Sequence, residues 1–192
     1  MDVGSFVLIG IVVVVDVVGY AIIIYNNLVS LKHAVAQAWA NIDVLLKQRH
    51  DELPKLVETC KQYMQYEQDT LEKVMQARAA VSDARARGDV AAVGAAESTL
   101  RLGLGNLFAV AEAYPDLKAN QSFQHLQTRI SGLENSIADR REFYNAAVNQ
   151  NNVRIEQFPD VLVANAFGFK SAQLLEFSEA EKADVDVKAL FG

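Results

Sequence analysis

Cysteine, proline and glycine are all scarce in this chain. One cysteine, Cys60, excludes an internal disulfide framework and supplies too few thiolates for a zinc-finger site. Three prolines and ten glycines in 192 residues permit long helices and argue against a turn-rich β-sandwich. Cations are outnumbered, since 18 lysine and arginine residues face 24 acidic residues and the net charge is −6. Nucleic-acid binding is therefore not expected, because it needs clustered cations that displace phosphate counterions.

An almost unbroken apolar run occupies residues 3–24, which read VGSFVLIGIVVVVDVVGYAIII. As a helix, these residues extend about 33 Å, enough to cross a hydrocarbon core of about 30 Å. The run predicts an uncleaved transmembrane anchor, whose membrane-span residues include Val3, Phe6, Ile11, Asp16, Tyr20 and Ile24. Two alternatives remain open. A cleavable signal peptide would need a basic start and a small-residue cleavage site, and a buried core helix would need a polar face.

Asp16 places a carboxyl group near the middle of the predicted span. A charge at that depth costs at least about 2.5 kcal/mol, so the carboxyl should be protonated, paired or turned toward another helix. Asp16 either marks a contact with a neighbouring span or is tolerated by a very apolar helix. The first cations after the run are Lys32, Lys47 and Arg49, and none precedes it. The positive-inside rule then favours a single-pass protein with its helical domain in the cytoplasm.

Beyond the apolar run, apolar residues recur at alternating spacings of three and four. Such spacing gives each helix one apolar face, as antiparallel bundles require. The predicted fold class is all-α: an N-terminal transmembrane helix followed by an antiparallel, up-and-down four-helix bundle with long, coiled-coil-like helices. The four apolar stripes contain Leu28, Leu31, Val35, Ala38, Ile42 and Leu45; Val57, Cys60, Met64, Leu71, Val74 and Val81; Val93, Leu100, Leu104, Leu107, Ala111 and Tyr114; and Phe123, Leu126, Ile130, Leu133, Ile137, Tyr144, Val148 and Ile155.

The expected helix ends follow from proline, glycine and capping residues. Pro54 suits the first turn of a helix and not its interior, so it predicts a boundary or a kink at residues 51–53. The other expected breaks are Gly88-Asp89, Pro115-Asp116 followed by a cap at Asn120 or Ser122, and Phe158-Pro159. The predicted domains are an anchor over residues 1–25, a bundle over 26–158 and a tail over 159–192. A two-helix hairpin kinked at the prolines is the alternative topology, but a bundle buries more of each stripe.

Sequence patterns of catalytic, metal and cofactor sites are missing. His33, His50 and His125 have no carboxylate or thiol at metal-binding spacing, and Cys60 lies in an apolar stripe. We therefore predict no catalytic residue, no metal and no cofactor. Charged and amide residues that interrupt the stripes are interpreted as a paired network that fixes helix register. These residues are Asp43, Arg49, Asp51, Glu58, Glu67, Glu72, Arg78, Glu134, Asn135, Arg140, Arg141 and Asn145.

The order of several short motifs resembles the LemA family of bacterial membrane proteins. The matching residues are Tyr25-Asn26, Leu28-Val29, Ala38-Trp39, Ile42-Asp43-Val44, Leu46-Lys47, Arg49, Leu53-Pro54, Leu56-Val57-Glu58, Lys61, Tyr63, Glu134-Asn135, Tyr144-Asn145, Phe158-Pro159 and Phe167-Gly168-Phe169. Glu52, Arg140 and Asn151 depart from the family pattern. The resemblance implies one membrane span and a four-helix type of bundle, and it brings no settled biochemical activity.

Three functional hypotheses follow from these observations. The preferred one is a non-enzymatic scaffold, a homo-oligomer that self-assembles at the bacterial inner membrane and organises membrane or partner proteins. The alternative is an adaptor or signalling subunit of a membrane protease or of another membrane protein complex. An enzyme is the third hypothesis, and no nucleophile-base pair supports it. The expected partners are membrane lipid, further copies of the chain and, in the adaptor hypothesis, another membrane protein.

The segment after the bundle is apolar and aromatic, and then acidic. In an up-and-down bundle the fourth helix returns toward the bilayer, so Phe158, Phe167 and Phe169 are predicted to lie at the membrane surface or at an interface. Alternatively, these residues cap the bundle core or pack against a neighbouring subunit. The acidic stretch beyond them is predicted to be a solvated end, and its residues are Glu176, Glu179, Glu181, Asp184 and Asp186.

Overall fold

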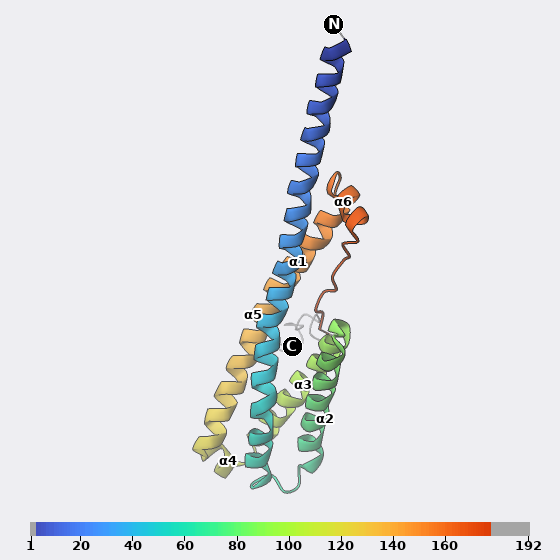
Figure 1. Cartoon of the computed structure of the whole chain (residues 1–192). Helices are drawn as coiled ribbons and strands as arrows, with labels where there is room; N and C mark the ends of the chain where they lie inside the picture. The colour runs from blue at the N-terminus through green and yellow to red at the C-terminus, as the bar shows by residue number, and fades with distance from the viewer. Residues whose placement is uncertain (1–2, 178–192) are drawn as a thin grey trace, which may run out of the picture. The chain divides into compact units, whose positions relative to one another are not determined.

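A computed structural model describes residues 3–177, and these residues form helices joined by short connections (Figure 1). The helices are α1 (Val3–Lys61), α2 (Gln68–Arg87), α3 (Val90–Ala111), α4 (Pro115–Ala119), α5 (Gln121–Glu156) and α6 (Asp160–Phe167). No strand occurs within this described part, so the all-α prediction is confirmed. The acidic residues predicted beyond Glu176, from Glu179 to Asp186, lie outside the described residues.

The chain divides into two compact units. The anchor unit comprises residues 1–40 and 143–172, and the bundle unit comprises residues 41–142 and 173–192. Both α1 and α5 contribute residues to each unit.

The bundle unit has one hydrophobic core, to which α1, α2, α3, α4 and α5 all contribute. Its buried residues are Leu53, Leu56, Val57, Cys60, Met64, Leu71, Val74, Ala77, Val81, Leu100, Leu104, Leu107, Ala111, Leu117, Phe123, Leu126 and Ile130. Successive long helices of this unit run in opposite directions (Figure 1). This arrangement confirms the helical bundle and excludes the two-helix hairpin.

Most of the predicted helix ends are found. Gly88 ends α2 in the left-handed conformation with φ 67°, which glycine adopts without steric cost. Asp89 then caps α3, because its carboxylate accepts a hydrogen bond from the Ala92 amide at 3.0 Å. At α5 the cap is Asn120, whose Oδ1 accepts from the Phe123 amide at 3.0 Å.

Pro54 does not end a helix. A boundary at residues 51–53 is wrong, because α1 continues through Pro54 to Lys61. Proline has no N–H to donate, so the carbonyl of His50, four residues earlier, loses its helical partner. Arg78 of α2 supplies the missing donor, since its Nε donates to the His50 carbonyl at 2.9 Å. The bond from Arg78 thus offsets part of the cost of a proline inside α1.

Residues 169–177 form an extended segment after α6. Its last part, residues 173–177, belongs to the bundle unit and packs on α3. A Cβ built on Gly94 would lie 2.0 Å from the carbonyl oxygen of Glu176, so only glycine fits beneath this segment. Leu175 and Phe177, on either side of Glu176, are buried. The guanidinium carbon of Arg141 lies 3.9 Å from the centre of the Phe177 ring, within the range of a cation–π contact.

The anchor unit contains the N-terminal part of α1, the C-terminal part of α5 and all of α6. The described residues contain one helix long and apolar enough to cross a membrane, α1, and its most apolar stretch is almost wholly uncovered. Ile24 and Leu28 of α1 pack with Ile155 of α5 and Ala164 of α6 in a small buried cluster. The helix α6 lies within the segment predicted only as a tail.

The bond between Arg78 and the His50 carbonyl can be tested in a double-mutant cycle. Arg78→Met keeps a long side chain but leaves that carbonyl unpaired, so we expect the free energy of unfolding to fall by about 1–3 kcal/mol. In a Pro54→Ala background the loss should be smaller, since alanine at this position restores the helical donor. Urea unfolding in mild detergent, followed by circular dichroism, measures both losses.

Arg87→Met, in the last turn of α2, serves as the control in the same cycle. It should change the free energy of unfolding by the same amount in the wild-type and Pro54→Ala backgrounds. Equal losses for Arg78→Met in the wild-type and Pro54→Ala backgrounds would contradict the proposed compensation.

Candidate membrane-interface site

The last residue of the apolar run, Ile24, is the first residue of the run that the protein buries. Ile22 and Ile23 are exposed, whereas Ile24 is 3% exposed. Ile24 is covered because it packs in the cluster that includes Ala164 of α6. Within the anchor unit, α6 therefore lies beside α1 at the end of the apolar run (Figure 1).

Two phenylalanines meet Tyr25, the residue directly after the run. The Tyr25 ring centroid lies 4.8 Å from that of Phe167 and 5.8 Å from that of Phe169. Both rings reach Tyr25 because the chain reverses between them at Gly168, which has φ 69°. The Phe169 amide then donates to the carbonyl of Ala164 at 2.9 Å, which closes the end of α6.

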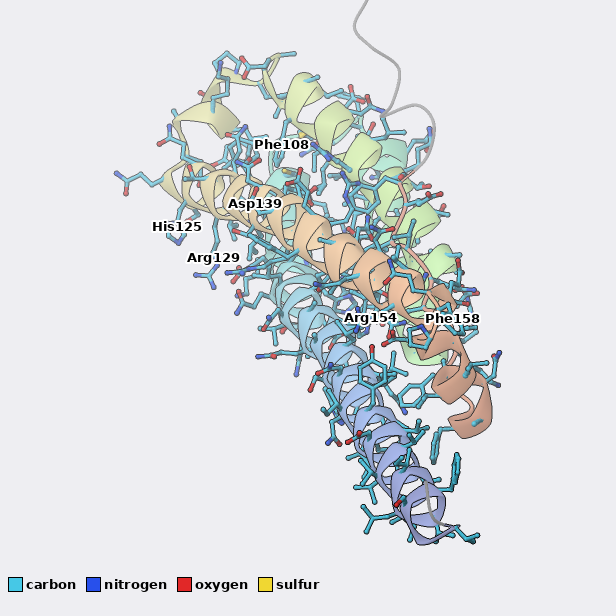
Figure 2. All side chains as sticks on the ribbon, turned by 90° about the horizontal axis from the view of Figure 1, so that it is seen from above. Phe108, His125, Arg129, Asp139, Arg154 and Phe158 are labelled. Carbon is cyan, nitrogen blue, oxygen red and sulfur yellow. The ribbon has the colours of Figure 1, made fainter. Side chains whose placement is uncertain are left out.

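The predicted interface residues differ in burial. Phe169 is half-buried and packs against the cluster around Ile24. In contrast, Phe158 and Phe167 are 79% and 65% exposed, and Leu162 between them is also exposed. Figure 2 shows Phe158 where α5 ends and α6 begins. We call Phe158, Leu162 and Phe167 the α6 patch.

Polar side chains of α5 hold the position of α6 and of the segment after it. Arg154 Nε lies 2.8 Å from Oδ1 of Asp160, the first residue of α6. The Asn152 side chain accepts from the Ala172 amide and donates to the Ala172 carbonyl, both at 2.9 Å. Asn151, which departs from the family pattern, is buried and donates to Asn152 Oδ1 at 3.2 Å. These bonds fix the extended segment against α5 within the anchor unit.

The bundle unit contains a second polar site, an arginine buried between two glutamates. Arg49 of α1 donates to Glu97 of α3 and to Glu134 of α5. Arg49 and Glu97 are 1% and 3% exposed. Burial alone would lower the pKa of Arg49, but the charges of Glu97 and Glu134 outweigh burial and raise it. Burial raises the pKa of Glu97, and Arg49 opposes this rise only in part. The arrangement links three helices through charge-assisted hydrogen bonds.

Several members of the predicted register network do form pairs. Besides Arg49 with Glu134, Arg78 reaches the His50 carbonyl and Asp43 Oδ1 lies 2.7 Å from Nη2 of Arg85. Outside the predicted network, Glu52 lies 3.0 Å from Nε of Arg129. These contacts tie helices of the bundle unit together.

Glu97 was missed by the sequence analysis, although the sequence contains a signal for it. It lies four residues after Val93 and three before Leu100, so it occupies a position of the third apolar stripe. A single acid at a stripe position indicates a buried partner on another helix, which here is Arg49.

Burial and charge shift the pKa values of two side chains of kinds that often take part in catalysis, Cys60 and His50. Burial raises the pKa of Cys60 to about 12, so its thiol remains protonated at neutral pH. Burial, followed by the charge of Arg78, lowers the pKa of His50. No group of three or more histidine, cysteine or acidic side chains within residues 3–177 is placed to hold a metal ion.

An uncovered apolar helix that continues into a helical bundle defines a class of membrane-associated helical proteins. Residues 38–189 match the family model described as the LemA family. The chain belongs to the LemA family. A relative that covers most of the chain is Protein LemA of Metamycoplasma hominis, 28% identical over 167 residues, or 86% of this chain and 74% of the relative.

Two further relatives carry the name of an organelle. Magnetosome protein MamQ 2 of Paramagnetospirillum magneticum is 35% identical over 88 residues, or 46% of this chain and 32% of that protein. Magnetosome protein MamQ of Magnetospirillum gryphiswaldense is 32% identical over 84 residues, or 44% of this chain and 30% of that protein. The chain thus matches about a third of the length of each magnetosome protein. None of these relatives has a name that denotes an enzyme.

The depth of the α6 patch can be measured with a tryptophan placed at Phe167. In a Trp39→Phe background, Phe167→Trp provides a single fluorophore in a chain reconstituted into vesicles. If the patch lies in the membrane interface, lipids brominated on their acyl chains should quench this fluorophore several-fold more strongly than one at an exposed position of the bundle unit. Tyr66→Trp, at a residue that is 93% exposed, provides that reference. Equal quenching at the two positions would place Phe167 in contact with protein or water only.

The buried acid predicts a pH dependence with a definite sign. Because the pKa of Glu97 is raised in the folded chain, the folded state binds more protons than the unfolded state between the ordinary glutamate value, about 4.3, and the raised value. Glu97→Gln removes this contribution. We therefore expect the free energy of unfolding of the wild type, minus that of the variant, to fall as pH rises through this window. The slope should reach at most about 1.4 kcal/mol per pH unit.

Urea unfolding at a series of pH values measures the difference, with Ser98→Ala as a control that changes no titratable group. A difference that is level or rises with pH would show that burial does not govern Glu97.

Proposed function

We propose that this protein is a non-enzymatic, membrane-anchored scaffold that self-assembles at the bacterial inner membrane. The observation that carries the proposal is Asp16. It lies in the middle of the apolar run, and its side chain is exposed on a helix that no other described part of the anchor unit covers at that level. A polar group that faces lipid is costly, by about 2.5–3.5 kcal/mol for an ionised aspartate at the helix centre. Association of several spans would bring each Asp16 to a polar partner on a neighbouring helix.

A groove in the anchor unit supports packing between copies. It lies between α1 and α5 and measures about 1030 Å³. Ala34, Ala146 and Ala147 line it with small side chains, which allow another helix to approach closely. Phe143 also lines the groove, is 63% exposed and is large enough to enter the same groove of a second copy. We propose that a second copy of the chain occupies this groove.

The proposed side of the membrane follows from charge. Lys32 and Lys47 are the first lysines after the apolar run, and both are exposed. The positive-inside rule favours the cytoplasm for the part of the chain that carries them. The bundle would then organise membrane or partner proteins from the cytoplasmic face.

Self-assembly through the span is tested by sizing the protein extracted in mild detergent. We expect the wild type to elute as an oligomer at micromolar concentration, and Asp16→Ala to dissociate at roughly fivefold to thirtyfold higher protein concentration. This range corresponds to the loss of one interhelical hydrogen bond per contact, about 1–2 kcal/mol. Asp16→Asn should retain the oligomer, because the amide still forms hydrogen bonds.

Gly10→Ala is the control, since a Cβ at Gly10 meets no described atom within 4 Å. A wild type that elutes as a clean monomer would contradict the scaffold. Recovery of one other membrane protein in place of a second copy, after cross-linking in membranes, would favour the adaptor hypothesis.

A further inference from the structure

A second groove of the anchor unit, of about 560 Å³, lies between α1 and the segment that follows α6. Its lining combines three aromatic rings with three basic side chains. The aromatic residues are Tyr25, Phe167 and Phe169, and the basic residues are Lys32, His33 and Lys170. None of the described residues that line this groove is acidic. We call it the basic groove.

The two lysines of the basic groove come from separate parts of the chain. Lys32 belongs to α1, and Lys170 belongs to the extended segment. Lys170 is brought to α1 by the reversal at Gly168 and by the two hydrogen bonds from Asn152 to Ala172. Both lysines are exposed, and within residues 3–177 neither forms an ion pair. An exposed cation pair without a carboxylate partner favours an anion as ligand.

The basic groove begins where the apolar run ends. Tyr25 directly follows Ile24, and Lys32 lies seven residues further along α1, or about 10 Å. Side chains of a helix tilt toward its N-terminus, so the Lys32 ammonium group is directed back toward the apolar run. In a bilayer crossed by residues 3–24, this depth corresponds to the headgroup layer. Aromatic rings favour the same layer.

We propose that the basic groove binds the headgroup of an acidic phospholipid. The lipid phosphate would lie between Lys32 and Lys170, with the glycerol region against Tyr25 and Phe167. The acyl chains would continue along the exposed surface of α1, where Ile22 and Ile23 face outward. A lipid would contact both the aromatic and the basic residues of the groove, whereas free phosphate would contact only the basic residues. Lipid binding requires the membrane anchor but not self-assembly. This proposal and the proposed self-assembling scaffold can therefore fail separately.

The test measures which lipid the purified full chain retains. Detergent-solubilised protein is equilibrated with equal amounts of phosphatidylglycerol and phosphatidylcholine, and bound lipid is counted by native mass spectrometry. We expect the wild type to retain phosphatidylglycerol preferentially. Lys32→Gln and Lys170→Gln should each reduce this preference about fivefold, the contribution that one lysine near an anionic surface typically makes.

The matched control is the double variant Lys47→Gln and Lys73→Gln, which removes the same charge from two exposed lysines of the bundle unit. We expect it to leave the lipid preference unchanged. Combining Lys32→Gln with Lys170→Gln gives the double variant that matches this control. Loss of the phosphatidylglycerol preference in the control, or an unchanged preference in the Lys32→Gln and Lys170→Gln double variant, would overturn the proposal.

Soluble glycerol phosphate separates a lipid from a free phosphate as the ligand. Because it lacks acyl chains, it should not displace phosphatidylglycerol at equal concentration. Displacement at equal concentration would show that the basic groove recognises a phosphate alone, and would overturn its assignment to lipid. A circular dichroism melt of each variant should match that of the wild type, since the substituted lysines are exposed.

Discussion

Arg49 imposes the central constraint on the bundle unit. A guanidinium group removed from water must be surrounded by carboxylates, and in this chain they come from Glu97 and Glu134 on two further helices. A shift of α1 by one helical turn would move Arg49 away from both and leave Arg49 and Glu97 buried without a charged partner. Apolar stripes alone tolerate a shift of one helical turn, because apolar residues recur every three or four positions and would still face the core. The charged cluster therefore selects one helix register among several that the apolar stripes permit.

Helix ends were predictable wherever one residue decides the backbone conformation. Gly88 and Asn120 act locally, through a left-handed φ and a capping side chain, and both predictions hold. Pro54 failed as a boundary because its cost is offset by Arg78, 24 positions away on another helix. The partner of Glu97 is Arg49, which lies 48 positions away in sequence and also on another helix. A single sequence shows that a polar group lies at a core position, but it does not show which residue satisfies that group.

The residues of the candidate interface were partly predictable. The sequence draws attention to the segment after the predicted bundle because aromatic residues cluster in it, namely Phe158, Phe167 and Phe169. Their different exposure, and the meeting of Phe167 with Tyr25, depend on the chain reversal at Gly168. Lys170 approaches α1 because Gly168 reverses the chain and Asn152 holds the backbone two residues further on. Such side-chain to backbone bonds follow no periodic pattern, so hydrophobic spacing does not reveal them.

The burial of Cys60 gives the chain an internal reporter of core opening. Cys60 is fully buried, and a pKa of about 12 keeps its thiol unreactive while the core is closed. Since the sequence contains no second cysteine, any thiol reagent that modifies the protein reports on this one site. The modification rate then becomes proportional to the fraction of molecules whose core is transiently open. The unmodified chain can therefore report fluctuations of its bundle core even inside a native membrane.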